Sequence, residues 1–422
     1  MSGASWHHIY AIVASRRLFV IFLMGASSGL PLLLTSSTLY WRLASEGVDK
    51  TTIGFYSLVG LPYTLKFLWS FVCDGVRFDM SFLGHRRSWI IITQCCLLAS
   101  LLLLGRINPI EQPYGVALAA LLVAFWSASQ DIVVDAYRIE MLAADEQAAG
   151  SMATQLGYRL GLLVSGAGAL FLSDHMAWHH VYDVMALCMV VGMAAVLLAP
   201  SPPRPVGDGG RHMPSSFQRV VMSPFMQFME KPHWCLLLIF IVLYKLTDAT
   251  LGVMANPFYY ELGFQASEVA LISKIYGVLA TLAGVVVGGF LCLRWGLYGG
   301  LLACGLAQML SNLVFIWQAA VGNHAGWLYV TITIENMTGG MGSAAFVAFL
   351  SALCHPMWAA TQYALLSSFM AFGRNVLSSF SGVFADMLGW PLFFLFSAII
   401  ALPSLWMMVA LRATFRRWLA SE

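Results

Sequence analysis

Residues 114–140 read YGVALAALLVAFWSASQDIVVDAYRIE. The first part of this stretch carries no charge, and a membrane-spanning helix needs about 20 predominantly apolar residues. Apolar and polar residues do not alternate along it, which favours a helix over a strand of a β-barrel. Asp131, Asp135 and Arg138 follow toward its end. The stretch therefore predicts a transmembrane helix that carries charges near one end.

The same apolar character extends over the whole chain. Of the 422 residues, 59% are hydrophobic and 10% are charged, whereas soluble proteins carry about 25% charged residues. A soluble enzyme is excluded, and so is a nucleic-acid-binding protein, because a net charge of +2 leaves no basic surface for phosphates. We expect an all-α membrane protein with twelve transmembrane helices, at residues 18–40, 52–73, 88–105, 114–138, 148–172, 181–199, 234–258, 269–291, 297–318, 326–351, 358–382 and 391–411.

The distribution of lysine and arginine predicts the orientation in the membrane. With the N-terminus inside, thirteen of these residues fall in inside segments and three in outside loops, so both termini are expected in the cytoplasm. Residues 200–232 contain six prolines and a Gly-Asp-Gly-Gly run, which predicts a cytoplasmic linker. The linker divides the chain into two expected six-helix bundles, residues 1–199 and residues 233–422.

The two halves resemble each other at a shift of 215 residues, which aligns Arg159 with Arg374 and Glu46 with Glu261. Each copy continues with an Asp and a Trp four residues apart, Asp174 and Trp178 in the first copy and Asp386 and Trp390 in the second. Duplicated six-helix halves are typical of transporters that move a substrate along a path between the halves. Chance similarity between apolar segments is the alternative explanation.

Glycine pairs occur within several of the expected helices. Gly25 and Gly29, Gly157 and Gly161, and Gly284 and Gly288 each lie four residues apart. Small residues at this spacing let two helices approach closely in a membrane. We therefore expect close helix packing at these pairs.

Three acids within the spans are candidates for proton coupling. Asp131 and Asp135 are four residues apart and share one helix face. Two carboxylates so close in a low dielectric resist ionising together, which suits a group that binds and releases a proton. Glu335, in the tenth span, has no neutralising neighbour in the sequence. The alternative for Asp131 and Asp135 is an ion-pair cluster with Arg138 that only fastens helices together.

Cations within the spans are candidates for substrate binding. Arg159, Lys274 and Arg374 have no acid within one turn of their own helices, and Arg can bind a carboxylate through two parallel hydrogen bonds. Tyr158, beside Arg159, suits stacking on a sugar ring. The predicted substrate-binding set comprises Gln130, Tyr158, Arg159, Lys274, Arg374 and Asn375. The alternative is that these cations pair with acids on other helices.

Other chemistries leave no signal. No Gly-x-x-x-x-Gly-Lys-Ser/Thr motif is present, so no ATP-driven mechanism is expected within this chain. No metal site and no cofactor are expected, since His175, His179 and His180 suit a solvated outside loop. A polytopic membrane enzyme would gather acids and histidines in a loop at one face, whereas here the charges lie within the spans. A receptor that binds without transporting is a further alternative.

The loop after the second span carries a recognisable pattern. Residues 70–89 read SFVCDGVRFDMSFLGHRRSW, which resembles a stretched form of the G-x-x-x-D-R-x-G-R-R signature of the major facilitator superfamily. Ser70 replaces the first glycine, and the gap before the two arginines is longer. The resemblance implies two six-helix bundles related by a pseudo-two-fold axis. It also implies that Asp74, Arg86 and Arg87 act in gating at the inner face.

Four stretches together are similar to one branch of that superfamily, the AmpG-type muropeptide permeases. They are SSGLPLLLTSSTL (27–39), GVDKTTIGFYSLVGLPYTLKFLW (47–69), SASQDIVVDAYRIEML (127–142) and GYRLGLLVSGAGAL (157–170). This resemblance implies a monomeric importer of anhydro-muropeptides in the bacterial inner membrane, driven by the proton motive force. It further implies roles in peptidoglycan recycling and β-lactamase induction. A transporter of another anionic substrate, such as acetyl-coenzyme A, is the nearest alternative.

Overall fold

The computed structural model describes residues 15–48, 52–53, 56–76, 83–201, 223–224, 226–264, 269, 272–378 and 380–419. Every regular element among them is a helix. The first half contains α2 (Arg16–Leu34), α3 (Ser37–Ser45), η1 (Tyr56–Gly60), α5 (Leu61–Leu65), η2 (Lys66–Leu68), α6 (Ser70–Gly75), α7 (His85–Arg106), α8 (Pro113–Met141), α9 (Gln147–Leu163), η3 (Val164–Gly168), α10 (Ala169–Ser173) and α11 (Trp178–Leu198). The second half contains α13 (Trp234–Glu261), η4 (Ile272–Tyr276), α15 (Gly277–Val321), α16 (Ala325–Leu353), η5 (Pro356–Trp358), α17 (Ala359–Ser378), α18 (Ser381–Leu388), α19 (Trp390–Ile399), α20 (Leu402–Ala410) and α21 (Arg412–Leu419).

These helices account for the apolar stretches of the sequence. Seven helical stretches are each long and apolar enough to cross a membrane, and α16 with the start of α17, which meet at 105°, would make an eighth. The remaining stretches contain short breaks or residues outside the described ranges. Apart from single turns, each of the twelve predicted stretches coincides with helix wherever it is described. The all-helical membrane fold is confirmed.

The longest helix is two spans joined by one residue. Gly296 lies inside the 45-residue α15 with φ 75° and ψ 163°, which breaks the helix. A Cβ atom on Gly300 would come within 2.6 Å of the Cα atom of Cys292, although these residues would lie about 12 Å apart along a straight helix. The chain therefore reverses at Gly296, between the predicted spans 269–291 and 297–318.

The second span is not the continuous helix that its hydropathy suggests. It consists of η1, α5, η2 and α6 in succession, with 3₁₀ turns at Tyr56–Gly60 and Lys66–Leu68. Pro62, which has no backbone N–H to donate, lies at the start of α5. The break places Lys66 at an irregular point of the helix, and discontinuous helices often form the binding sites of transporters.

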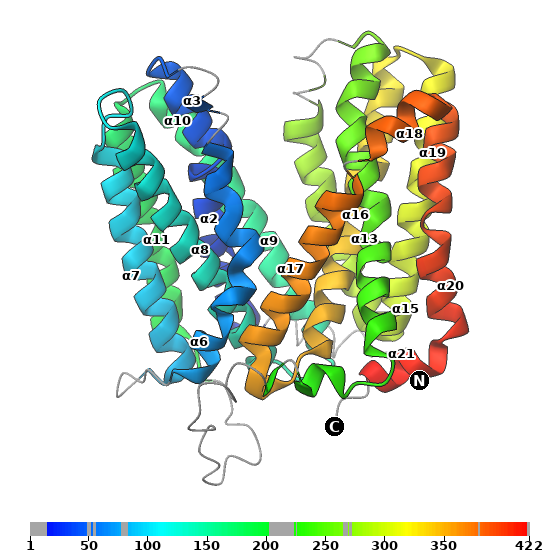
Figure 1. The fold of residues 1–422 in the computed structure, drawn as a ribbon, viewed down its shortest axis with the longest axis horizontal. Coiled ribbons are helices and arrows are strands. Elements are labelled where there is room, and N and C mark those ends of the chain that lie inside the picture. The colour runs from blue at the N-terminus through cyan, green and yellow to red at the C-terminus, as the bar shows by residue number, and fades with distance from the viewer. Residues whose placement is uncertain are drawn as a thin grey trace.

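Figure 1 shows the helices in two groups, α2 to α11 and α13 to α21. The groups meet at one end, where α17 packs against α6 and α8, and they diverge toward the other end. We call the first the linker end, because α11 ends there at Leu198. Residues 202–222 of the predicted linker lie outside the described residues, so the domain limits 1–199, 200–232 and 233–422 stay predictions.

The outside of both groups is apolar, as a membrane protein requires. Large apolar side chains are exposed along the outer helices of the first half and of the second, for example Leu118, Leu187, Leu310 and Trp406. So much exposed apolar surface is stable only against lipid.

The glycine pairs lie where two helices touch through their backbones. A Cβ atom on Gly157 would lie 2.0 Å from the carbonyl oxygen of Phe22, and one on Gly29 would lie 2.2 Å from that of Tyr158. Helices α2 and α9 therefore pack in direct backbone contact. Gly284 of α15 meets Met337 of α16 in the same way, at 2.0 Å. The predicted close packing is confirmed.

The sequence repeat has a structural counterpart at the end opposite the linker. The indole of Trp178 donates to Ser45 Oγ at 3.1 Å, next to Glu46. In the second half, the indole of Trp390 donates to Glu261 Oε2 at 2.6 Å. In both halves a tryptophan at the start of the last span is thus bonded to the end of the first span.

Candidate functional site

A polar cluster surrounds Asp131 inside the first half. Asp131 lies on α8 and is half-buried. Lys66 of η2 attracts its carboxylate, Asp135 repels it, and the Ser28 hydroxyl on α2 faces it. The Tyr63 hydroxyl of α5 lies near Asp131 as well. The irregular second span therefore brings a cation and a hydroxyl to the one predicted coupling acid of the first half that has no ion pair within 4 Å in the described residues.

Tyr158 and Arg159 lie on α9, next to this cluster. The Tyr158 ring lies within electrostatic range of Asp131 and Asp135. Arg159 is half-buried, and no hydrogen bond or ion pair joins its guanidinium to another described residue. Four residues beyond Leu160, the π-helical turn η3 (Val164–Gly168) distorts the same span, and such turns are frequent at functional sites. A cation without a partner and an aromatic ring together suit an anionic sugar derivative.

Asp135 differs from Asp131 because it has a partner. Its Oδ1 atom lies 3.2 Å from Arg138 Nη2, and the Arg138 side chain is almost fully buried. The ion-pair alternative considered for this run of charges thus describes Asp135, whereas Asp131 stays apart from Arg138.

Gln130 does not lie where a substrate could reach it in this conformation. It is 0% exposed, and its amide donates to Ser27 Oγ of α2 at 3.1 Å. Gln94 of α7 donates to the same oxygen at 3.1 Å. Because successive helical residues point about 100° apart, Gln130 points into the helix bundle while Asp131 faces the polar cluster. The assignment of Gln130 to substrate binding is corrected to a role in packing three helices.

The second half contributes a different set of charges. Glu335 on α16 is half-buried, and no ion pair joins it to a cation among the described residues. Asp248 on α13 acts on it as a like charge. Asp248 is itself paired with Lys245 at 3.1 Å. The side chains of Lys274, Arg374 and Asn375 lie outside the described residues, so their part in the site stays a prediction.

A buried charge cluster joins the halves at the linker end. Arg86 Nη2 donates to Asp74 Oδ1 and to Glu140 Oε1, both at 2.6 Å. The other Asp74 oxygen accepts from the backbone N–H of Thr361 at 2.9 Å and from its hydroxyl at 2.6 Å. Thr361 lies in the first turn of α17, where backbone N–H groups attract an anion. We call Asp74, Arg86, Glu140 and Thr361 the Asp74 cluster.

Arg87 belongs to a different contact. It donates to the carbonyl oxygens of Leu83 and Ala199 and to Ser201 Oγ, at 2.5, 2.7 and 2.7 Å. These bonds tie the start of α7 to the end of α11 within the first half. Of the three predicted gating residues, Asp74 and Arg86 thus lie in the cluster that reaches the second half, whereas these Arg87 contacts stay within the first.

Two members of the Asp74 cluster were not among the predicted gating residues. Glu140 carried a signal, since it belongs to the charged run that ends the fourth span. Thr361 carried none, because it is separated from Asp74 by 287 residues. Only the packing of α17 against α6 brings the two together.

Two cavities of the structure lie away from these residues. One, of about 260 Å³, is lined mainly by aromatic side chains of α18 and α19, including Phe384 and Phe393. The other, of about 580 Å³, lies at the start of α2 beside α9 and is lined by residues such as Arg16 and Met152. Neither is lined by a predicted substrate or coupling residue, so we assign the site from the charges rather than from these cavities.

Known proteins share this organisation. The proton:xylose symporter XylE, of the major facilitator superfamily, superposes with a TM-score of 0.65 at 12% identity, and the match covers 96% of each chain. A family model described as Acetyl-coenzyme A transporter 1 matches residues 17–193. The anhydromuropeptide permease of Escherichia coli K12 is 40% identical over 94% of this chain and 79% of its own length. Putative transporter AmpG 4 of Rickettsia conorii is 35% identical over 96% of this chain and 98% of its own length.

The helical fold and the buried charges between its halves define a multi-pass membrane transporter of the major facilitator superfamily rather than an enzyme. Within that superfamily, the chain belongs to the AmpG-type permease family.

Proposed function

We propose that this chain imports anhydro-muropeptides across the inner membrane of a bacterium. These wall fragments join N-acetylglucosamine to anhydro-N-acetylmuramic acid and a peptide. The 40% identity with an anhydromuropeptide permease over 94% of the chain is the observation that carries the proposal. The free guanidinium of Arg159 suits the carboxylates of the peptide, and Tyr158 suits the sugar rings. Lys274, Arg374 and Asn375 complete the proposed site from the second half.

The proposed mechanism is proton symport by alternating access. Asp131 or Glu335 binds a proton from the outside, the substrate enters, and the two halves rock so that both are released into the cytoplasm. Protonation of Asp131 removes the charge that attracts Lys66, which frees a cation for the substrate. Both termini are cytoplasmic in this scheme, and the monomer is the transporting unit. Uptake would supply peptidoglycan recycling and, through it, β-lactamase induction.

Acetyl-coenzyme A is the second candidate substrate, because the family model that matches residues 17–193 is described as an acetyl-coenzyme A transporter. Both substrates are anionic, so a cationic site alone does not separate them. Competition separates them, since only the true substrate class reduces uptake of a labelled muropeptide at micromolar concentration.

Uptake of labelled anhydro-muropeptide into right-side-out vesicles tests the proposal. We expect accumulation that a protonophore abolishes and that unlabelled wall fragments compete away, while coenzyme A esters do not. Accumulation that survives a collapsed proton gradient would reject proton coupling. Absence of uptake from vesicles that transport a control sugar would reject the substrate.

Replacing Arg159 with glutamine is expected to raise the KM for muropeptide about tenfold to a hundredfold, because a charged hydrogen bond contributes about 1.5–3 kcal/mol. Initial uptake rates over a range of substrate concentrations measure this. Arg106→Gln is the matched control, since Arg106 forms an exposed ion pair with Asp183 outside the site. An unchanged KM in Arg159→Gln would remove Arg159 from the substrate site.

Replacing Asp131 with asparagine is expected to abolish uphill accumulation while exchange of internal for external substrate continues. Asparagine keeps the shape of the side chain but cannot carry a proton, so the halves can still move without coupling. Counterflow and accumulation assays on the same vesicles measure both activities. Asp183→Asn is the control, and accumulation at the native level by Asp131→Asn would exclude Asp131 and leave Glu335 as the coupling acid.

A further inference from the structure

Arg138 is a buried cation at the surface where the two halves meet. It is 0% exposed, on α8. Its Nη2 atom lies 3.2 Å from Asp135 Oδ1 of its own helix and donates to Ser351 Oγ of α16 at 2.8 Å. Its guanidinium carbon lies 5.2 Å from the centre of the Tyr363 ring of α17. Two of its three contacts thus come from the second half of the chain.

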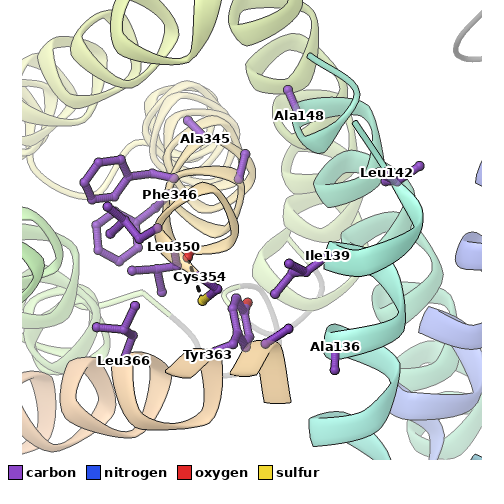
Figure 2. Close-up of a cluster of buried hydrophobic side chains, with 14 of the residues drawn as sticks. Ala136, Ile139, Leu142, Ala148, Ala345, Phe346, Leu350, Cys354, Tyr363 and Leu366 are labelled. Carbon is purple, nitrogen blue, oxygen red and sulfur yellow. Dashed lines mark hydrogen bonds between the residues drawn. The ribbon is translucent and has the colours of Figure 1, made fainter. Parts of the chain in front are cut away.

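The surroundings of Arg138 are apolar and packed. Figure 2 shows Ala136, Ile139 and Leu142 of α8 facing side chains of α16 and α17, among them Cys354 and Tyr363. A cation buried in such surroundings is costly unless its partners are in place. When the halves separate at the linker end, Ser351 and Tyr363 leave with the second half, and Asp135 alone remains. Arg138 therefore favours the conformation in which this end is closed, because its contacts differ between the two conformations.

This contact is separate from the Asp74 cluster. Asp74 reaches the second half through Thr361 at the start of α17, whereas Arg138 reaches it through Ser351 on another helix. Arg138 binds Asp135, and Arg86 binds Asp74 and Glu140, so no acid is shared in the ion pairs of the described residues. Contacts that share no partner should contribute independently to closure.

We propose that Arg138, held in place by Asp135, is a positioning residue that latches the linker end through Ser351 and the Tyr363 ring. The latch rests on the proposed function only in that opening of this end would be the release step of import. Asp135 then acts on the halves through Arg138, which separates its role from that of Asp131. Release of the latch is a change of conformation that can be measured without any substrate.

Cys354 is a native reporter for this change. Its thiol is 6% exposed and donates to the Leu350 carbonyl oxygen at 3.2 Å, and it lies beside Tyr363 at the junction (Figure 2). Cys304 is 0% exposed within the second half. Opening of the linker end should expose Cys354 alone, whereas unfolding should expose both. Labelling of the purified full chain with a maleimide, read for each cysteine by peptide mass spectrometry, distinguishes the two events.

We expect Arg138→Gln to increase the initial labelling rate of Cys354 about tenfold, with Cys304 unchanged. Tyr363→Leu should increase it several-fold, and Tyr363→Phe should leave it near the native rate, because phenylalanine keeps the ring that the guanidinium faces. Asp135→Asn should increase it by freeing Arg138. Combining Arg138→Gln with Asp74→Asn should multiply the two separate increases.

Protection of Cys354 in both Arg138→Gln and Tyr363→Leu, in a chain where Asp74→Asn exposes it, would overturn the proposal. If Arg138→Gln exposes Cys304 as well, Ser351→Ala and Arg138→Lys decide, since each weakens one contact and keeps the charge. Exposure of Cys354 alone in these variants supports the latch, and protection in both refutes it. A chain that shows the labelling response but no muropeptide uptake would keep the latch and lose the proposed substrate.

Discussion

Replacing Arg86 with glutamine is expected to remove about 3–5 kcal/mol of stabilising free energy, the cost of leaving buried carboxylates without their cation. Arg86 is 6% exposed and compensates two acids, Asp74 and Glu140, which have side-chain exposures of 0% and 12%. Whole proteins are stable by only about 5–15 kcal/mol, so we expect little folded transporter to remain. Thermal unfolding of the purified chain and its yield in the membrane measure the loss.

A second arginine provides the matched control for Arg86. Arg106 pairs with Asp183 at 2.9 Å, but both side chains are substantially exposed. Such surface pairs contribute about 0–1 kcal/mol, so Arg106→Gln should unfold close to the native temperature. Equal unfolding temperatures for Arg86→Gln and Arg106→Gln would show that the Asp74 cluster is not a stabilising element.

The second large effect is expected from Gly157→Ala. The added Cβ atom would lie 2.0 Å from the Phe22 carbonyl oxygen and 2.8 Å from the Ala26 nitrogen. Both are backbone atoms, so no side chain can rotate away and α2 must move from α9. Overpacking of this kind costs about 1–3 kcal/mol. The displaced segment carries Tyr158 and Arg159, so muropeptide uptake should fall about tenfold or more as well.

Gly60→Ala is the control for that substitution. No atom lies within 4 Å of the position that a Cβ atom would take on Gly60, and its φ of -74° suits any residue. We expect native yield and uptake from Gly60→Ala and losses of both from Gly157→Ala. Native behaviour of Gly157→Ala would contradict the direct backbone contact between α2 and α9.

The two substitutions act on different properties of the transporter. Gly157 concerns packing within the first half, whereas Arg86 stabilises a cluster that also contacts Thr361 of the second half. Unfolding should therefore be affected by both, but exposure of Cys354 at the linker end should respond more strongly to changes around Asp74 and Arg138. Measuring unfolding and labelling on the same preparations separates stability from gating.

Much of the fold could be predicted from local features of the sequence. The length and apolarity of each span depend only on neighbouring residues, because lipid selects for them along the chain. The glycine pairs, such as Gly157 and Gly161, were predictive for the same reason: their spacing puts both on one helix face. The break in the second span was missed, because hydropathy does not distinguish an α-helix from short 3₁₀ turns around Pro62.

The candidate site was only partly predictable. Asp131, Arg159 and Glu335 were identified because a charge within a span is rare and needs a partner or a role. Gln130 was misassigned, since adjacency to Asp131 in the sequence says nothing about facing the same way on a helix. Arg138 was recognised as a charge near Asp135, but the Tyr363 ring that it faces belongs to the other half.

The sequence by itself determined that this protein spans a membrane as an all-helical chain, to which family it belongs, and which charges lie within its spans. The tertiary structure alone decided which of those charges have partners. Asp74 reaches Thr361 across 287 residues, and Arg138 reaches Ser351 across 213. Each partner lies on a helix of the other half, and the face that a helix turns toward another depends on the packing of all of them rather than on its own residues.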